Sequence, residues 1–368
     1  MDDSSLTSLT LGERAGVRGR TSNLTPSLNT SPLHFTGGQG ARTLPPQPLS
    51  PPSPAARWIG TDEAGYGPNL GPLVISTTSW ELPAPGPEFD LYAALSAAVD
   101  RDSNAGGAKL HLADSKQVYS PGRGLASLET SALALLAQTG PIPRTFQELA
   151  ARLTGEPLRA GEGEPWLRSE MTALPVAASL PDVERLAASL RATCAASGVR
   201  LTVLSSDMVE TPRFNAECAA AGSKGVVLSR TTLKLLERHW PADAVPTLVT
   251  CDKHGGRNQY AALLSETFGD LFIPCLEESP AISRYKLRGG EVRFQVRAEQ
   301  FLPTAAASIL SKYLREIAME QFNAFWGAQV RGLKPTKGYP EDARRFRTEI
   351  AHQQREFGIP DAVLWRER

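Results

Sequence analysis

Two adjacent carboxylates, Asp62 and Glu63, stand between a short strand-like segment and a segment rich in glycine and proline. Five of the nine residues that follow Glu63 are Gly or Pro, and a second apolar segment begins at Leu73. Glycine tolerates positive φ and lets a ligand approach the backbone, whereas a plain hairpin needs only about two turn residues. Acidic side chains at a strand end beside such a loop are well placed to bind metal ions that contact a phosphodiester. The alternative is structural, with two strands simply joined by a Gly/Pro loop.

Two more carboxylates occupy comparable positions further along the chain. Asp252 ends a β-branched run at 247–252, and Glu299 precedes a long helical pattern. Carboxylates about 4 Å apart do not all stay ionised without cations. Mg²⁺ binds one or two such groups and keeps substrate oxygens, and two ions about 3.5–4 Å apart stabilise an in-line displacement. The set predicts metal-dependent phosphodiester cleavage; the alternative for Asp252 is a residue that only caps its strand.

One geometric condition applies to the adjacent pair. Neighbouring residues of a strand point to opposite faces of the sheet, so Asp62 and Glu63 serve one site only if the strand ends at them. Gly65 makes such an ending easy.

Other chemistries lack their motifs. The chain contains no Gly-x-Ser-x-Gly elbow, no phosphate-loop lysine and no His-Glu-x-x-His. His254, close to Asp252, is either a proton shuttle or, as we favour, an exposed loop histidine. The four cysteines form no Cys-x-x-Cys pair, which argues against a zinc site or a disulfide framework and favours a reducing cytosol.

The composition is that of a globular protein with no overall excess of basic residues. At 368 residues, 41% of them hydrophobic and 21% charged, the chain can bury a substantial core. Its net charge is zero, so nucleic-acid binding has to come from local basic patches. No apolar run approaches the ~18 residues that a membrane helix needs, so no membrane association is expected. Residues 1–56 are rich in Ser, Thr, Pro and Gly and are predicted to be disordered.

Strand and helix patterns alternate along the rest of the chain, which predicts an α/β fold. The strands are expected at 58–63, 73–78, 174–178, 199–205, 247–252 and 271–275, with a hairpin at 283–297. The main helices are expected at 89–99, 125–138, 145–153, 181–196, 226–239, 304–322 and 341–357. The helix at 304–322 has the strongest pattern, with Thr304 or Ser308 as its cap. From the helical pattern alone, Lys312 and Arg315 are expected only to lie on the solvent-exposed face of this helix.

Six segments in order resemble the type 2 ribonucleases H, that is, ribonuclease HII and its relative HIII. They are Asp-Glu-Ala-Gly-Tyr-Gly-Pro at 62–68 with Gly71-Pro72, Asp-Ser-Lys at 114–116, Asn215 at a helix entry, Asp252 after its strand, Ala-Ala-Ser-Ile-Leu-Ser-Lys at 306–312 with Arg315 and Met319, and Gly-Tyr-Pro at 338–340. Six elements in family order are far more specific than any one of them.

The resemblance implies a ribonuclease H fold, with a mixed five-stranded sheet flanked by helices in a catalytic domain at 57–325. A C-terminal helical extension follows at 326–368, and residues 85–108 and 139–197 are insertions relative to a minimal enzyme. The implied activity is hydrolysis of the RNA strand of RNA–DNA hybrids, or cleavage of DNA at embedded ribonucleotides, leaving 5′-phosphate and 3′-hydroxyl ends. A cytoplasmic monomer is expected.

The resemblance also implies site residues. The catalytic ligands of Mg²⁺ or Mn²⁺ are then Asp62, Glu63, Asp252 and Glu299. Backbone groups of the loop read the ribose 2′-hydroxyl, which distinguishes RNA from DNA, at Gly65, Tyr66 and Gly67. Tyr339 stacks on the sugar at the cleavage junction. The other implied substrate contacts, mainly to phosphates, are Ser115, Lys116, Ser308, Lys312 and Arg315.

Several features depart from the family pattern, among them the loop and the chain end. Tyr66 stands where an Arg or Lys is usual between the two glycines, and the chain end at 364–368 lacks the basic closing motif. The first departure bears on how the substrate strand is anchored. Two alternatives therefore stay open: a nucleic-acid-binding protein that keeps the fold without cleavage, and a two-metal nuclease with a different substrate.

Overall fold

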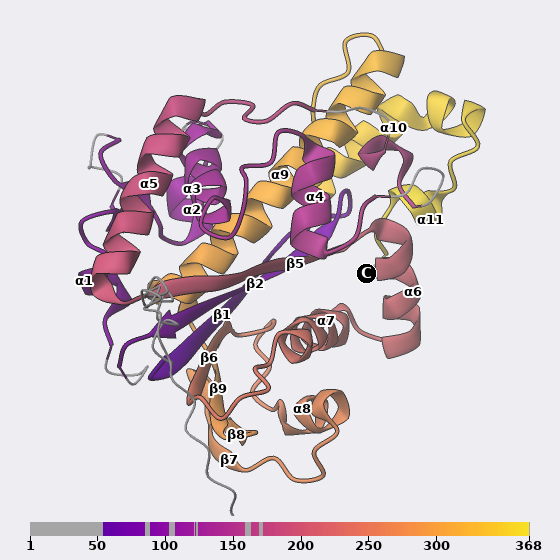
Figure 1. Cartoon of the computed structure of the whole chain (residues 1–368). Coiled ribbons are helices and arrows are strands. Elements are labelled where there is room, and N and C mark those ends of the chain that lie inside the picture. The colour runs from indigo at the N-terminus through magenta and orange to yellow at the C-terminus, as the bar shows by residue number, and fades with distance from the viewer. Residues whose placement is uncertain are drawn as a thin grey trace, which may run out of the picture. The chain divides into compact units, whose positions relative to one another are not determined.

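The adjacent carboxylates lie on an inner strand of a mixed seven-stranded sheet (Figure 1). The computed structural model describes residues 54–84, 89–102, 107–120, 122, 124–158, 163–168 and 172–367. The strands are ordered β5-β2-β1-β6-β9-β8-β7, and the short strands β3 and β4 pair separately. Their bounds are β1 (Ala56–Ala64), β2 (Leu73–Leu82), β3 (Val99–Asp100), β4 (Leu110–His111), β5 (Arg200–Val209), β6 (Thr247–Asp252), β7 (Cys275–Glu278), β8 (Ile282–Leu287) and β9 (Gly290–Gln295).

Strand direction places two carboxylate-bearing strand ends side by side. β1 runs parallel to β6, and β6 runs parallel to β9, whereas β2 is antiparallel to both β1 and β5. Parallel strands end at the same edge of a sheet, and here Thr61 of β1 pairs with Cys251 of β6. Asp62 and Asp252, the next residue on each strand, therefore meet at that edge.

The sheet has seven strands where five were expected. β5, β2, β1, β6 and β9 are successive neighbours, and β8 and β7 continue the sheet beyond β9. The hairpin predicted at 283–297 is confirmed: β8 and β9 pair antiparallel around Arg288 and Gly289, both at positive φ. Because this tight turn keeps β8 hydrogen-bonded to the outer edge of β9, the hairpin extends the sheet.

Helices cover both faces of the sheet (Figure 1), which confirms the predicted α/β class. One face carries α3 (Ala126–Leu136), α4 (Phe146–Thr154), α5 (Leu180–Ser197) and α9 (Leu302–Gln329). The other face carries α6 (Thr211–Ala221), α7 (Lys224–Arg238) and α8 (Ala261–Phe268). Strand side chains alternate between the two layers: Trp58 and Trp80 pack with α9, whereas Ile59, Leu73 and Ile75 pack with α7.

The long helix α9 begins two residues earlier than predicted and ends later. Pro303 lies in its first turn, where a missing N–H costs nothing and the fixed φ suits a helix. Thr304 and Ser308, the predicted caps, are therefore inside the helix and buried. The Thr304 hydroxyl instead donates to the Thr250 carbonyl (3.1 Å), which ties α9 to β6.

Shorter elements depart more from the sequence expectations. The helix expected at 89–99 is reduced to α1 (Leu91–Ala94). In the described residues 174–178 no strand forms, and a single bridge joins Thr145 to Ala173. The helix α8 was not expected, and β7 begins where the strand at 271–275 was expected to end. In such short segments tertiary contacts outweigh local propensity.

Beyond α9 the chain forms α10 (Pro340–Glu356) and α11 (Asp361–Leu364), so the helix predicted at 341–357 is confirmed. The domain boundaries at 56 and 325 stay predictions; α9 runs through residue 325. The predicted disordered segment 1–56 lies outside the described residues except for its last three. All described residues belong to one compact unit, Pro52–Arg368.

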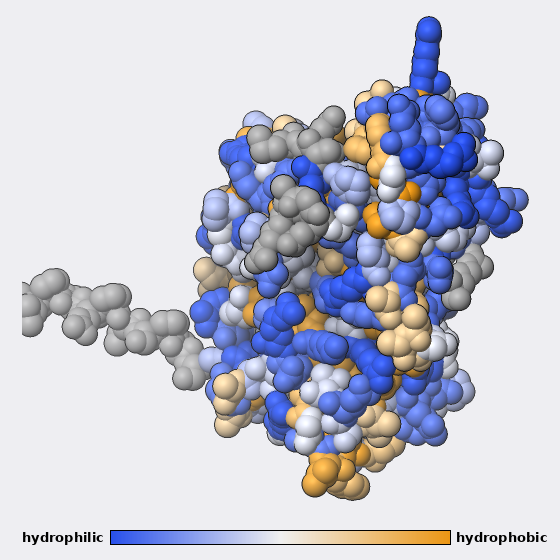
Figure 2. Space-filling model, turned by 90° about the vertical axis from the view of Figure 1, so that its right-hand side faces the viewer, coloured by the Kyte–Doolittle hydropathy of each residue, from blue (hydrophilic) through white to orange (hydrophobic). Residues whose placement is uncertain are grey.

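The surface of this unit is mostly hydrophilic on the face shown in Figure 2. Hydrophobic residues gather at its lower end, at the height of α8 and β7 in Figure 1. Leu271 and Phe272, between α8 and β7, are among the exposed large apolar residues. None of the helices in the described ranges is both long and apolar enough to cross a membrane.

Candidate functional site

The strand β1 continues past the two adjacent carboxylates. Asp62 pairs opposite Ser76 and Glu63 opposite Ile75, so the strand does not end at the pair as one shared site required. The two side chains therefore lie on opposite faces of β1. Asp62 is on the α9 side, near the Ser308 side chain.

The charge of Asp252 nevertheless acts on each of the other three predicted metal ligands, Asp62, Glu63 and Glu299. Burial raises the pKa of Asp62 well above its ordinary value, and the charges of Glu63 and Asp252 raise it further. Burial and the charge of Asp252 raise the pKa of Glu63 to about 7. Burial also raises the pKa of Asp252 and of Glu299, and the charge of Asp252 adds to the shift at Glu299. The fold thus brings these four residues into what we call the acidic cluster.

Glu299 reaches the cluster through a short 3-10 turn, η4 (Ala298–Gln300), that precedes α9. The turn follows Arg297, which adopts a left-handed conformation with φ of 61°. The Ala298 N–H donates to the Asp252 carboxylate at 3.5 Å and so holds η4 against the end of β6. This contact explains how a residue far along the chain comes to lie beside Asp252.

The acidic cluster has the donor chemistry of a site for hard divalent cations. Its ligating atoms are carboxylate oxygens, and a bound cation would offset the burial and the repulsion that raise their pKa values. Among the described residues, however, no three Asp, Glu, His or Cys side chains converge so as to hold an ion. The opposite orientation of Glu63 and Asp62 on β1 accounts for part of this. The residue types therefore fit Mg²⁺ or Mn²⁺, but this part of the chain holds no preformed cage of three ligands.

The helix α2 (Ser115–Val118) brings the Asp-Ser-Lys motif to the acidic cluster. Asp114 caps α2 by accepting the Lys116 N–H (3.0 Å). The Ser115 N–H donates to the Ser308 hydroxyl (3.3 Å), which donates to the Ser115 hydroxyl (3.0 Å) and so joins α2 to α9. The charge of Asp114, followed by those of three members of the acidic cluster, raises the pKa of Lys116. Lys116 is an exposed cation beside the acids, whereas Ser115 and Ser308 are buried between helices.

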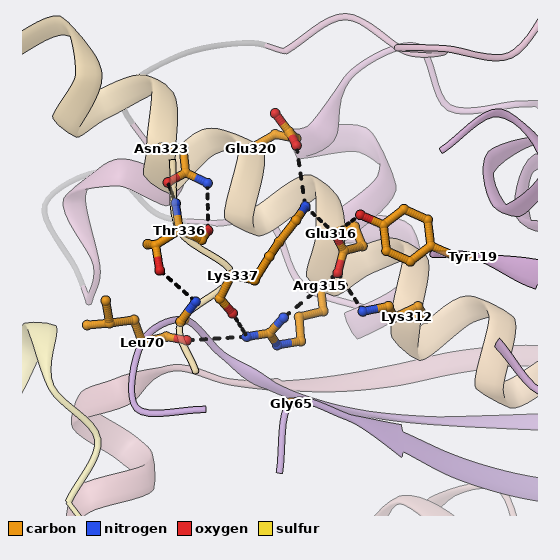
Figure 3. A network of polar contacts seen from close by, with 12 residues as sticks. Gly65, Leu70, Tyr119, Lys312, Arg315, Glu316, Glu320, Asn323, Thr336 and Lys337 are labelled. Carbon is orange, nitrogen blue, oxygen red and sulfur yellow. Dashed lines mark hydrogen bonds and ion pairs between the residues drawn. The ribbon is translucent and has the colours of Figure 1, made fainter. Parts of the chain in front are cut away.

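Lys312 belongs to a polar network around a buried carboxylate (Figure 3). Glu316 accepts hydrogen bonds from Lys312 and Lys337, both at 2.6 Å, and from the Tyr119 hydroxyl at 2.9 Å. Burial acts to raise the pKa of Glu316, but the charges of the two lysines outweigh it and lower the pKa to about 2. The ammonium groups of Lys312 and Lys337 also lie 5.0 and 5.7 Å from the Tyr119 ring centroid. Sequence reasoning missed Lys337, although it directly precedes the Gly-Tyr-Pro motif.

Arg315 is buried beneath the glycine loop, as we call residues 65–72. Its Nη2 donates to the carbonyl oxygens of Lys337 (3.1 Å) and Leu70 (3.3 Å), as Figure 3 shows. A Cβ atom on Gly65 would lie only 2.5 Å from the Arg315 Nε, so the loop rests directly on this side chain. The placement favours support of the loop over the phosphate contact that the resemblance implied.

The glycine loop is joined to the turn that carries Tyr339. The Gly338 carbonyl accepts hydrogen bonds from the N–H groups of Asn69 (2.8 Å) and Leu70 (3.3 Å). A Cβ atom on Gly67 would lie 3.9 Å from the Tyr339 ring, and both residues are exposed. Two residues predicted to contact substrate are therefore surface neighbours.

Tyr66 is directed toward α7. Its ring packs against the apolar cluster that α6 and α7 share, and the Lys224 Nζ lies 4.6 Å from the ring centroid. The position at which the family usually has a cation therefore holds a tyrosine, with a lysine from α7 over its ring.

His254 is not the exposed loop histidine that we expected. It is 4% exposed, lies against Tyr260 and Phe294, and shares a hydrogen bond between its Nδ1 and the Ser229 hydroxyl (3.0 Å). Burial and the nearby charge of Arg257 lower its pKa to about 3, so the ring is neutral near pH 7. Aromatic residues from later segments close over this position, which local sequence does not reveal.

No protein-family model matches the chain, and no curated protein matches it. Solved structures that match include ribonuclease HII from Archaeoglobus fulgidus in complex with PCNA (TM-score 0.41, 16% identity, covering 84% of this chain and 94% of that one). Ribonuclease H2 from Pyrococcus horikoshii matches with a TM-score of 0.43 and 14% identity, covering 84% and 92%. Bst ribonuclease HIII in complex with Mn²⁺ matches with a TM-score of 0.44 and 16% identity, covering 86% and 67%. All three are named as members of the family that the motifs resemble, but at these TM-scores and identities the similarity carries no conclusion about activity.

Proposed function

We propose that this protein is a divalent-metal-dependent endonuclease that hydrolyses the RNA strand of RNA–DNA hybrids or cuts DNA at embedded ribonucleotides. The acidic cluster supports the proposal, because β1 and β6 run side by side to Asp62 and Asp252 and the charge of Asp252 acts on Asp62, Glu63 and Glu299. The glycine loop and Tyr339, which the family resemblance links to the substrate ribose, adjoin each other at the surface. Six motifs of that family in order give the substrate class.

In this proposal Asp62, Asp252 and Glu299 bind the metal ions, and Glu63, on the opposite face of β1, joins them only where β1 departs from its pairing with β2. The ions would polarise the scissile phosphodiester and the attacking water. The carboxylates act only as ligands, and β1, β6 and η4 position them. The protein's own substrate contacts are backbone groups of the glycine loop to the ribose, the Tyr339 ring to the sugar, and three lysines to phosphates: Lys116, Lys312 and Lys337.

A cleavage assay with three labelled duplexes tests the proposal. The full-length protein is incubated with Mg²⁺ or Mn²⁺ and an RNA–DNA hybrid, a DNA duplex with one ribonucleotide, or an all-DNA duplex. We expect cleavage of the hybrid, of the ribonucleotide-containing duplex, or of both, and none of the all-DNA duplex. Asp62→Asn should lower the cleavage rate at least about 100-fold while hybrid binding persists.

The matched control replaces a carboxylate outside the cluster. Glu237 is exposed on α7, so Glu237→Gln should cleave at the wild-type rate. Cleavage of the all-DNA duplex by the wild type would contradict the ribonuclease assignment and indicate a two-metal nuclease with another substrate.

The second candidate is a nucleic-acid-binding protein that keeps the fold without cleavage. The missing preformed cage in the described residues favours it. In that case no duplex is cut with either metal, and the wild type and Asp62→Asn bind the hybrid with equal affinity.

A further inference from the structure

The end of the chain is joined to the glycine loop. The Arg366 N–H donates to the Asn69 carbonyl (2.8 Å), and the Asn69 side-chain amide donates to the Arg366 carbonyl (3.1 Å). These residues are 297 positions apart in the sequence. The two reciprocal bonds place Arg366 directly against the loop.

The guanidinium of Arg366 holds both ends of the loop at once. Its Nη1 donates to the Gly65 carbonyl and, at 3.5 Å, to the Gly71 carbonyl. Its flat face lies 3.9 Å from the centroid of the Phe214 ring. A guanidinium can donate to these carbonyls while its flat face stacks on an aromatic ring, and a lysine ammonium has no such flat face.

The charge of Arg366 is buried, and no carboxylate of the described residues forms an ion pair with it. The residue is 1% exposed. Burial, followed by the charge of Arg315, lowers its pKa to about 9, and its Nε has no hydrogen-bond partner in this part of the chain. Burying a charge in this way costs free energy that an apolar side chain of similar size avoids. Unlike an apolar residue, Arg366 can donate hydrogen bonds to the carbonyl oxygens of the loop.

The segment that carries Arg366 is also held from the opposite side by α6. The Asn215 side-chain amide donates to the carbonyls of Ala362 (3.1 Å) and Trp365 (2.8 Å). Its oxygen accepts the Glu367 N–H (2.8 Å). Residues 361–367 are thereby attached to a rigid helix independently of their contacts with the loop.

These contacts set the direction of the loop's peptide groups. The carbonyl of Gly65 faces Arg366, and in a planar trans peptide the N–H of the next residue, Tyr66, points the opposite way. Arg315 acts likewise at Leu70, so the Gly71 N–H is directed away from the buried guanidinium. The two arginines thereby fix the direction of these N–H groups.

We propose that residues 361–367 are a positioning element for the glycine loop, in which Arg366 joins the two ends of the loop and fixes the backbone groups that meet the RNA strand. The identity of the ligand rests on the proposed function; the positioning of the loop does not.

Hydrogen–deuterium exchange of the full-length protein tests the positioning directly. Arg366→Gln should speed exchange of the amides in residues 65–71 at least tenfold, because both carbonyl contacts are lost. Asn215→Ala should do so to a smaller extent. The matched control Arg355→Gln removes an exposed arginine in the last turn of α10 and should change nothing in the loop.

An unchanged loop in Arg366→Gln overturns the proposal. If that variant unfolds, Asn215→Ala takes its place, because it keeps Arg366 and removes only the attachment to α6. Unchanged exchange of residues 65–71 in a folded Asn215→Ala protein then overturns the proposal.

Kinetics on the hybrid distinguish positioning from general support of the fold. Arg366→Gln should raise KM about tenfold and change kcat less than about threefold, since the acidic cluster is untouched, with Arg366→Lys in between. A lower kcat at an unchanged KM indicates loss of folded protein only and contradicts the proposal. If the wild type cuts nothing, the proposed cleavage fails by itself; the Kd for the hybrid then replaces KM, and the exchange result still decides the role of Arg366.

Discussion

Glu316 is a buried carboxylate that links three segments around the candidate site. It joins three segments, through Lys312 on α9, Lys337 before α10 and Tyr119 after α2. Its carboxylate is buried, and the lysines are partly buried. Removing one partner of such a group leaves the others desolvated and unpaired, which is costlier than losing a surface ion pair.

We therefore expect Glu316→Gln to lower the free energy of unfolding at pH 7 by about 2–3 kcal/mol. The folded-state pKa of about 2 lies below the ordinary value of 4.5, so this stabilisation is complete above about pH 4.5 and is lost as the pH falls toward 2. The difference between wild type and variant in urea unfolding should shrink over that range. Glu237→Gln serves as control, and a difference that stays constant down to about pH 3 would contradict the ion-pair network.

At the scale of elements, the contact between α9 and β1 depends on a glycine. A Cβ atom on Gly60 would lie 2.1 Å from the Pro303 carbonyl carbon and 2.2 Å from the Thr304 nitrogen. Both are backbone atoms, which cannot rotate away as a side chain can. Because residue 60 has no side chain, the first turn of α9 can pack directly on β1. This contact also positions η4 and Glu299, which precede the helix.

Gly60→Ala should destabilise the protein by about 3 kcal/mol or more, because overpacking a backbone contact forces the helix off the strand. Gly327→Ala is the matched control: it lies in the same helix, is exposed, and its Cβ would meet nothing within 4 Å. Because alanine is the better helix former, this control should stabilise by about 0.5–1 kcal/mol. Thermal unfolding compares the two, and a tolerated Gly60→Ala would refute the close approach.

At the scale of the whole molecule, zero net charge means that duplex binding depends on a few local cations. The exposed or partly exposed lysines nearest the site are Lys116, Lys312 and Lys337. Each phosphate contact contributes about −0.9 to the slope of log Kobs against log salt concentration.

The slope for binding of a hybrid by the Asp62→Asn protein should therefore be no steeper than about −3. Lys337→Gln should make it shallower by about 1, whereas Lys234→Gln, an exposed lysine on α7, should leave it unchanged. A slope that Lys337→Gln does not alter would remove that residue from the set of phosphate contacts. Fluorescence anisotropy over a range of salt concentrations measures the slope for each protein.

Much of the architecture follows from local patterns in the sequence. Apolar and β-branched runs predict β1, β2 and β6, the spacing along 304–322 predicts most of α9, and the hairpin of β8 and β9 follows from its glycine turn. The acidic residues at strand ends and the order of the motifs predict which residues gather at one edge of the sheet. These features are local or periodic, so they depend little on how distant segments pack.

Only the tertiary structure decides what surrounds those residues. Glu63 faces away from Asp62 because β1 stays paired with β2 beyond them. Glu316 meets Tyr119 across 197 positions, and Arg366 meets Gly65 across 301 positions, and neither contact has a sequence signal. Such pairs form only when whole elements have packed, since it is packing that removes water from a charge and turns a backbone carbonyl toward it. The sequence by itself therefore predicts the members of the acidic cluster, whereas the packed fold determines their faces, their pKa values and the support of the glycine loop.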